Sequence, residues 1–298
     1  MNLSQPIVTL TLNPALDLTL QLPQLHLGEV NLARQGELHP AGKGINVARV
    51  LRDLGQAVIV TGILGEENRR EFDALFQRHG FENAFLYERG NTRINVKISE
   101  EDTGRVSDIN LPGLQVAPAT WQALGERLQA LSRQSQLFVL SGSIPRGLDT
   151  SAYAVLIDRI HAQGGRVIVD TSGAALRAAV DARPQIVKPN LDELSQWAGR
   201  PLPSVAAQEA VIRQWLQKGI RHVVLSCGRE GLRWYSANQA WEALPPAVEV
   251  VSTVGAGDSL VAGLAYGLAN GMTVEDTLVL ATAAAALAVT QVGVGIPS

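Results

Sequence analysis

The chain has 298 residues, of which 46% are hydrophobic and 18% charged, and this length allows one large α/β domain or two smaller ones. Its formal net charge of −3 at pH 7 and its lack of a dense Lys/Arg run give no electrostatic basis for binding nucleic acid. A single cysteine, Cys227, excludes an intramolecular disulfide and fits a reducing cytoplasm.

The first sixty residues predict two buried strands and a helix, and a segment of half-exposed strands lies between the first strand and the helix. No Lys or Arg precedes Arg34, so we expect no secretory signal. Residues 7–10 and 58–60 are short β-branched runs, which are typical of strands buried on both faces. Residues 16–40 instead alternate apolar and polar side chains, as half-exposed strands do. In residues 47–54 the apolar positions recur at i, i+3, i+4 and i+7, which predicts a helix.

The middle of the chain repeats both patterns. Residues 92–111 alternate like 16–40, and we expect the two segments to form a small β-layer beside the main domain. A helical pattern returns at 154–160. Further buried strands are predicted at 137–140, 167–169, 185–187 and 222–225. Strands that alternate with helices predict a mostly parallel central sheet flanked by helices on both faces.

The C-terminal segment is the only stretch that resembles a membrane span. Residues 277–298 carry no charge, and 278–289 are strongly apolar. However, the segment is rich in alanine and is interrupted by Thr282 and Thr290, whereas a span needs about 20 predominantly apolar residues. We therefore expect a buried core helix and no membrane partner.

Polar residues follow five of the predicted strands. They are Asn13 and Asp17, Ser141–Ser143, Asp170, Lys188–Asn190 and Ser226–Gly228. In open α/β sheets, ligands bind outside the carboxyl ends of the strands. These residues therefore predict a single site at one edge of the sheet.

The strongest motif is Thr-Val-Gly-Ala-Gly-Asp-Ser at 253–259. Glycines before a helix let backbone N–H groups face an anion. We expect Asp258 to be ionised and to accept a hydroxyl proton, while the amides of Gly255, Ala256 and Gly257 stabilise a transferred phosphoryl group. The alternative is that Asp258 only caps the helix. No Walker A loop occurs in the chain, and Leu260 breaks a Rossmann fingerprint.

A second glycine-rich turn, Pro-Ala-Gly-Lys-Gly-Ile-Asn-Val-Ala, opens the helix predicted after residue 40. Gly42 and Gly44 permit close approach of the backbone to a ligand. Lys43 can meet a phosphate, and Asn46 can bond sugar hydroxyls. The alternative is a helix start with a solvated lysine.

Three weaker signals complete the set. Lys188, Asn190 and Glu193 leave a strand and begin a helix, where Glu193 could hold Mg²⁺ through its waters or, with Asn190, only cap the helix. Residues 226–231 predict a tight bend after a strand. This bend could be only a hairpin turn, or it could offer backbone amides to a nucleotide. Arg93 suits a phosphate, although an exposed ion pair would explain it equally well.

The chain resembles the pfkB-type carbohydrate kinases, which share the ribokinase-like fold. The resemblance covers nearly the whole chain and rests on residues 9–17, 41–48, 92–97 and 251–259. It implies one α/β kinase domain over 1–298, with a mostly parallel central sheet, helices on both of its faces, and a small β-sheet lid contributed by about 13–40 and 90–113. In this family the lid often packs against a second subunit, so the resemblance implies a homodimer.

The resemblance also implies residue roles. Asp258 would be the catalytic base, with the amides of Gly255, Ala256 and Gly257 as the anion hole. The sugar phosphate would be bound by Asp17, Gly42, Lys43, Gly44, Asn46, Arg93 and Ser141. ATP would be bound by Lys188, Asn190, Glu193, Ser226, Gly228 and Gly231, with Glu193 holding Mg²⁺ indirectly, through a bound water.

The implied reaction is phosphoryl transfer from MgATP to the C6 hydroxyl of fructose 1-phosphate. Tagatose 6-phosphate or fructose 6-phosphate is the alternative acceptor within the family. A non-catalytic nucleotide or sugar-phosphate sensor is the alternative from a different class, and it predicts ligand binding without ADP production.

Overall fold

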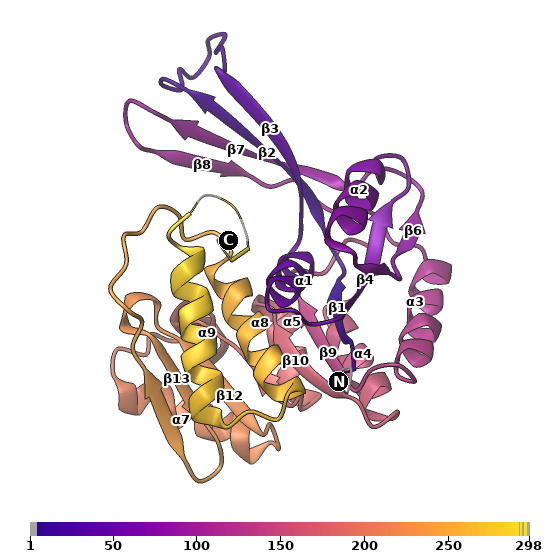
Figure 1. The fold of residues 1–298 in the computed structure, drawn as a ribbon, viewed down its shortest axis with the longest axis vertical. Helices are drawn as coiled ribbons and strands as arrows, with labels where there is room; N and C mark the ends of the chain where they lie inside the picture. Colours follow the sequence, from indigo (N-terminus) through magenta and orange to yellow (C-terminus); the bar gives the residue numbers. More distant parts are fainter. Residues whose placement is uncertain (1–4, 292, 294, 297–298) are drawn as a thin grey trace.

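The computed structural model describes residues 5–291, 293 and 295–296 (Figure 1). Within them, ten strands form one sheet in the order β14-β13-β12-β11-β10-β9-β1-β4-β5, and β6 also pairs with β4. The strands are β1 (Ile7–Thr11), β4 (Val58–Gly65), β5 (Glu82–Asn83), β6 (Leu86–Glu88), β9 (Leu137–Ser141), β10 (Arg166–Asp170), β11 (Ile186–Val187), β12 (His222–Ser226), β13 (Leu232–Tyr235) and β14 (Ala240–Ala243).

All six predicted core strands are present, and the sheet is parallel from β4 to β12, which confirms the predicted fold class. Only β13 and β14 run antiparallel, as a hairpin extension of the sheet edge beyond β12. The central strands are completely buried, because each is covered on both faces.

Helices cover the two faces, and alternate strand residues divide between them. The helices are α1 (Lys43–Asp53), α2 (Arg70–His79), α3 (Pro118–Leu131), α4 (Ala152–His161), α5 (Gly173–Asp181), α6 (Leu191–Ala198), α7 (Val205–Gln217), α8 (Ala256–Ala269) and α9 (Val274–Ala288). Helices α1, α2, α8 and α9 share one hydrophobic cluster with Ile7 and Ile168. Helices α3, α4 and α5 share another with Val8 and Val169, and α6 and α7 continue that face toward β12. Neighbouring strand residues point to opposite faces, so both helix layers pack on the same strands.

The apolar C-terminal segment forms α9, a core helix as predicted. It lies against α8 at very short distance, since a Cβ built at Gly263 would lie 2.5 Å from the Cα of Ala281. This close packing explains the many small residues in both helices. No described helix combines the length and the apolar character that crossing a bilayer requires.

A second sheet of four strands projects from the body (Figure 1). Its order is β3 (Gln35–Ala41), β2 (Ala15–Leu22), β7 (Arg93–Glu100) and β8 (Val106–Ile109). To within one residue at each end, all four strands fall inside the two segments, 16–40 and 92–111, whose alternating pattern predicted a separate β-layer. The two segments are joined by parallel pairing of β2 with β7.

Candidate active site

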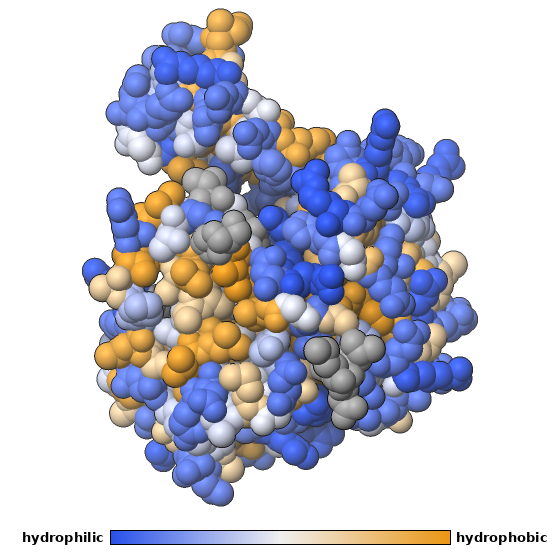
Figure 2. All heavy atoms as spheres, in the orientation of Figure 1, coloured by the Kyte–Doolittle hydropathy of each residue, from blue (hydrophilic) through white to orange (hydrophobic). Residues whose placement is uncertain are grey.

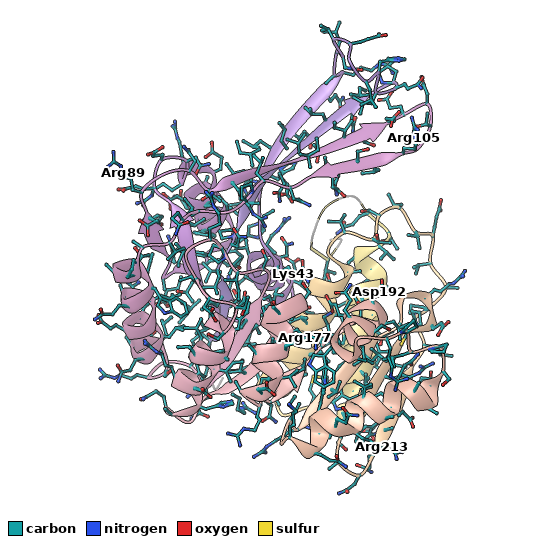
Figure 3. All side chains as sticks on the ribbon, turned by 180° about the vertical axis from the view of Figure 1, so that it is seen from behind. Lys43, Arg89, Arg105, Arg177, Asp192 and Arg213 are labelled. Carbon is teal, nitrogen blue, oxygen red and sulfur yellow. The ribbon has the colours of Figure 1, made fainter. Side chains whose placement is uncertain are left out.

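The carboxyl ends of the central strands bring together side chains from distant parts of the chain. Asp170 ends β10 and pairs in register with Ser141 at the end of β9. Lys188 follows β11 and donates its backbone N–H to the carbonyl of Val169. Lys43 begins α1 and lies near the centre of the molecule, below the projecting sheet (Figure 3). The predicted convergence of polar residues at this edge is therefore present.

Asp258 lies in the first turn of α8 with only 7% of its surface exposed. Its carboxylate accepts a 2.8 Å hydrogen bond from Nδ2 of Asn46 on α1. It does not cap the helix, because the N-cap is Gly255, whose φ of 82° is left-handed and suits glycine. The alternative that Asp258 only caps the helix is therefore wrong. The hydrogen bond from Asn46 to Asp258 also places the two glycine-rich turns next to each other.

The pKa of Asp258 is raised to about 6, chiefly by burial and then by the nearby Asp170 carboxylate. Lys43, the hydrogen bond from Asn46 and Lys188 act in the opposite direction. The expectation that a helix start alone keeps this group ionised is thus incomplete, because burial opposes ionisation. Above about pH 6 the group is a carboxylate that can accept a proton.

Asp170 forms ion pairs with two lysines, although the sequence placed it only at the predicted edge of the sheet and gave it no role. Its Oδ2 lies 3.1 Å from Nζ of Lys43, and its Oδ1 lies 3.3 Å from Nζ of Lys188. Asp170 and Lys188 are 1% and 4% exposed. Its place directly after a buried strand was the only signal in the sequence, because no motif surrounds it.

These charges shift one another's pKa values. Burial favours neutral Asp170, but Lys188 and Lys43 outweigh it and hold the pKa of Asp170 below its ordinary value. Burial also lowers the pKa of Lys43. The nearby carboxylates outweigh burial and raise this pKa overall, with the largest effect from Asp170, then Asp258, and a smaller effect from Glu193. The lysine is therefore a permanent cation, not the freely solvated side chain of the alternative reading.

The predicted anion site lies at the N-terminus of α8. The first N–H groups of a helix have no intrahelical acceptor and carry partial positive charge. A Cβ built at Gly257 would meet only Nζ of Lys188, at 3.9 Å. The buried ammonium group therefore lies beside this turn, and both features attract an anion.

Gly42 and Gly44 have a packing reason that the sequence did not reveal. Gly42 is the N-cap of α1 with a φ of 150°, and a Cβ at Gly44 would lie 2.8 Å from the carbonyl oxygen of Leu10. The glycines thus let α1 lie directly against β1. Their contact with a ligand remains a prediction.

Asn190 and Glu193 form a complete capping box at the start of α6. The Asn190 side chain accepts from the N–H of Glu193 at 2.8 Å, and Glu193 Oε2 accepts from the N–H of Asn190 at 2.9 Å. The capping alternative is therefore correct. It does not exclude a ligand, because Oε1 of Glu193 lies outside the box.

The segment 226–231 is a hairpin turn between β12 and β13, as one of the two readings proposed. It contains a short 3₁₀ turn at Gly228–Glu230. A Cβ at Gly231 would lie 2.1 Å from the carbonyl oxygen of Ala243, so this glycine is required by the packing of the hairpin. Cys227 is a buried free thiol. Contacts of Ser226, Gly228 and Gly231 with a nucleotide remain predictions.

Arg93 is neither free nor in an exposed ion pair. Its guanidinium donates to the carbonyl oxygens of Asn13, Pro14 and Leu111, at 3.1, 3.3 and 3.2 Å. These carbonyls lie where the chain enters and leaves the small sheet. Arg93 therefore fastens the base of that sheet.

Two further residues that were predicted to bind the sugar phosphate are Asp17, on the small sheet, and Ser141, at the end of β9. On the polar face of the small sheet, Asp17 accepts a 3.0 Å bond from Nδ2 of Asn95, a residue that sequence reasoning did not select. Ser141 is fully buried, and its hydroxyl has no hydrogen-bond partner among the described residues.

Comparison with known proteins identifies the family and supports the fold. The sequence model described as pfkB family carbohydrate kinase matches residues 10–298. The 1-phosphofructokinase of Vibrio cholerae is 48% identical over 294 residues, which cover 99% of this chain and 92% of the relative. The crystal structure of Escherichia coli phosphofructokinase-2 in complex with potassium has a TM-score of 0.91 at 30% identity and covers 97% of this chain and 94% of that one. The tetrameric inhibited form of the same enzyme has a TM-score of 0.89 at 29% identity, with 96% and 94% covered.

Proposed function

Because the chain belongs to the pfkB family of carbohydrate kinases, we propose that it is a 1-phosphofructokinase that converts fructose 1-phosphate and ATP into fructose 1,6-bisphosphate and ADP. The observation that carries the proposal is the buried carboxylate of Asp258 beside the amides of α8 and two ammonium groups. The identity to relatives named 1-phosphofructokinase supports fructose 1-phosphate as the acceptor.

In the proposed reaction, Asp258 accepts the proton of the C6 hydroxyl while that oxygen attacks the γ-phosphorus in line and the bond to the ADP oxygen breaks. A buried base with a pKa of about 6 is ionised at neutral pH, yet basic enough to take a proton in the transition state. The amides of Gly255, Ala256 and Gly257, at the N-cap and in the first turn of α8, stabilise the charge on the transferred group.

The acceptor would lie between α1 and the small sheet. Asp17 and Asn46 hold its hydroxyls, with the backbone at Gly42 and Gly44 close by. Its existing phosphate meets Lys43. Ser141 offers a buried hydroxyl that has no hydrogen-bond partner among the described residues, which suits a ligand. Arg93 has five N–H donors, three of which bind carbonyls, so two remain for a phosphate.

The nucleotide would lie between α8 and the hairpin turn. Lys188 and Asn190 meet the ATP phosphates, and Ser226, Gly228 and Gly231 border the base and ribose. No group of three acidic, His or Cys side chains occurs among the described residues, so a metal ion held by the protein alone does not fit. One free oxygen of Glu193 fits an Mg²⁺ ion that keeps its waters and binds the phosphates, where it would neutralise their charge.

We further propose that the small sheet is a lid and the contact surface of a homodimer. Leu38, Leu18, Val96 and Ile109 stand in one row across its four strands, on the face opposite to Asp17. Leu38 and Ile109 are 40% and 53% exposed, and Figure 2 shows further hydrophobic residues at the tip of this sheet. An uncovered apolar sheet face of this kind favours contact with a second copy. The tetrameric form of phosphofructokinase-2 supports an oligomer.

The proposal is tested by measuring ADP release with fructose 1-phosphate, fructose 6-phosphate and tagatose 6-phosphate. We expect kcat/KM for fructose 1-phosphate to exceed the others by roughly 10²-fold, because a site that pairs a charged group rejects a substrate that misplaces it. A preference for either 6-phosphate would move the assignment to a sister activity. Thermal stabilisation by these ligands without ADP release would instead indicate a sensor and contradict the kinase proposal.

A further inference from the structure

Asp170 lies under the proposed site, and the reaction described above gives it no role. Its carboxylate is 1% exposed, and each of its two oxygens contacts the ammonium group of a different lysine, Lys43 or Lys188. One lysine comes from α1 and the other from the segment after β11. A single carboxylate therefore fixes two cations that belong to separate elements.

Both lysines depend on the carboxylate of Asp170. Lys188 is 4% exposed, and a buried ammonium group without an anion is strongly unfavourable. Two ammonium groups on neighbouring sites also repel each other, unless an anion lies between them. Each ammonium group has three N–H donors. Lys43 gives one of them to Asp170 in a hydrogen bond, whereas Lys188 meets Asp170 as an ion pair at 3.3 Å. At least two donors on each lysine are therefore not used by Asp170 and can meet phosphate oxygens.

We propose that Asp170 is a positioning residue that holds Lys43 toward the acceptor phosphate and Lys188 toward the transferred phosphoryl group. The assignment of the two lysines rests on the proposed function. Lys188 stands beside the first turn of α8, next to Gly257. Lys43 stands on α1, one turn before Asn46, which binds Asp258. Asp170 itself touches neither substrate in this arrangement.

The same geometry gives Asp170 an electrostatic effect on Asp258. The groups that face Asp258 are Asn46 and Lys43 on α1, Asp170 at the end of β10 and Lys188 after β11, while Glu193 on α6 acts on Lys43. Asp170 makes ionisation of Asp258 harder, and both lysines make it easier. Removing Asp170 and removing Lys43 must therefore change the basicity of Asp258 in opposite directions.

The experiment compares the parent protein with Asp170→Asn, Lys43→Met and the double variant. The pKa of Asp258 is followed in the free protein through carboxyl-carbon NMR of [¹³C]aspartate, with the signal identified by its loss in Asp258→Asn. We expect it to fall by roughly 0.5–1 in Asp170→Asn, to rise in Lys43→Met, and to return close to the parental value in the double variant. We expect kcat of Asp170→Asn to fall roughly 10–100-fold, because the two cations are no longer fixed.

The matched control is Asp192→Asn, which removes a negative charge from the exposed start of α6 (Figure 3). It should keep the parental kcat and the parental pKa of Asp258. Parental kcat in Asp170→Asn overturns the proposal. A loss of activity without a fall in the pKa of Asp258 also overturns it, because Asp170 would then only stabilise the fold. If Asp170→Asn does not fold, Lys43→Met decides, since an unchanged pKa there contradicts the proposal. The titration needs no substrate, so its result stands apart from a failure of the proposed reaction.

Discussion

At the scale of single residues, the site is defined by one carboxylate that burial makes more basic. Asp258 is 7% exposed, and its pKa is raised to about 6 by that burial and by Asp170. The stretch 255–258 predicted this residue as a base from the sequence, because glycines before a helix are typical of an anion site. Asp170 could not be identified in the same way. Its role depends on two lysines that lie 127 residues before it and 18 after it, and only the folded sheet brings them together.

The raised pKa of Asp258 predicts a gain in stability when the charge is removed. Folding favours the protonated form, so the stabilising contribution is present below about pH 4 and is lost as pH rises through about 6. Asp258→Asn should therefore increase the free energy of unfolding at pH 8 by about 2–3 kcal/mol, with little difference at pH 4. Urea unfolding at the two pH values measures this. Equal or lower stability of the variant at pH 8 would contradict the burial of an ionised group at this position.

At the scale of elements, the regular strands were predictable and the contacts between elements were not. Buried apolar runs located β1, β4, β9, β10, β11 and β12, since strands covered on both faces have a distinctive composition. The alternating segments correctly indicated β2, β3, β7 and β8. Gly44 and Gly231 were predicted to lie near a ligand. The structure adds a packing reason for both glycines, because neighbouring carbonyls leave no room for a side chain at either position. The sequence does not distinguish a glycine that approaches a ligand from one that approaches another strand.

The contact of α8 with α9 gives a prediction at this scale. Gly263→Ala should destabilise the protein by about 1–3 kcal/mol, although alanine favours a helix, because the new methyl group overlaps the backbone at Ala281. Denaturant unfolding measures the change. The control is Val279→Ala on the outer side of α9, where 68% exposure predicts a change within about 0.5 kcal/mol. Equal stability of Gly263→Ala and the parent would show that the helices are farther apart than described.

At the scale of the whole molecule, a three-layer α/β body carries a small four-stranded sheet that exposes apolar side chains on one face. Arg93 joins the two parts through three backbone carbonyls, a structural task that the sequence did not indicate. Its contact with a phosphate stays a prediction. A phosphate and a carbonyl oxygen both attract a guanidinium group, and composition alone does not separate them. The row of Leu38, Leu18, Val96 and Ile109 forms the apolar face that is proposed as the dimer contact.

This surface predicts the assembly state. Ile109→Glu should dissociate the proposed dimer, because two charged side chains would be buried in an apolar contact. Light scattering coupled to size-exclusion chromatography measures the mass. Val205→Glu, at an exposed position of α7, is the matched control and should leave the assembly unchanged. A monomeric mass of the parent protein at micromolar concentration would contradict the proposed dimer.

The central claim is that Asp258 accepts the proton of the attacking hydroxyl inside a pocket that binds phosphate independently of it. Steady-state turnover of Asp258→Asn, measured together with ATP affinity by calorimetry, tests it most directly. We predict that kcat falls by roughly 10²–10⁴ while ATP binding stays nearly parental, because the amides of α8 and Lys188 remain in place. Turnover within a few-fold of the parent would contradict the claim, and the proton would have to be accepted elsewhere.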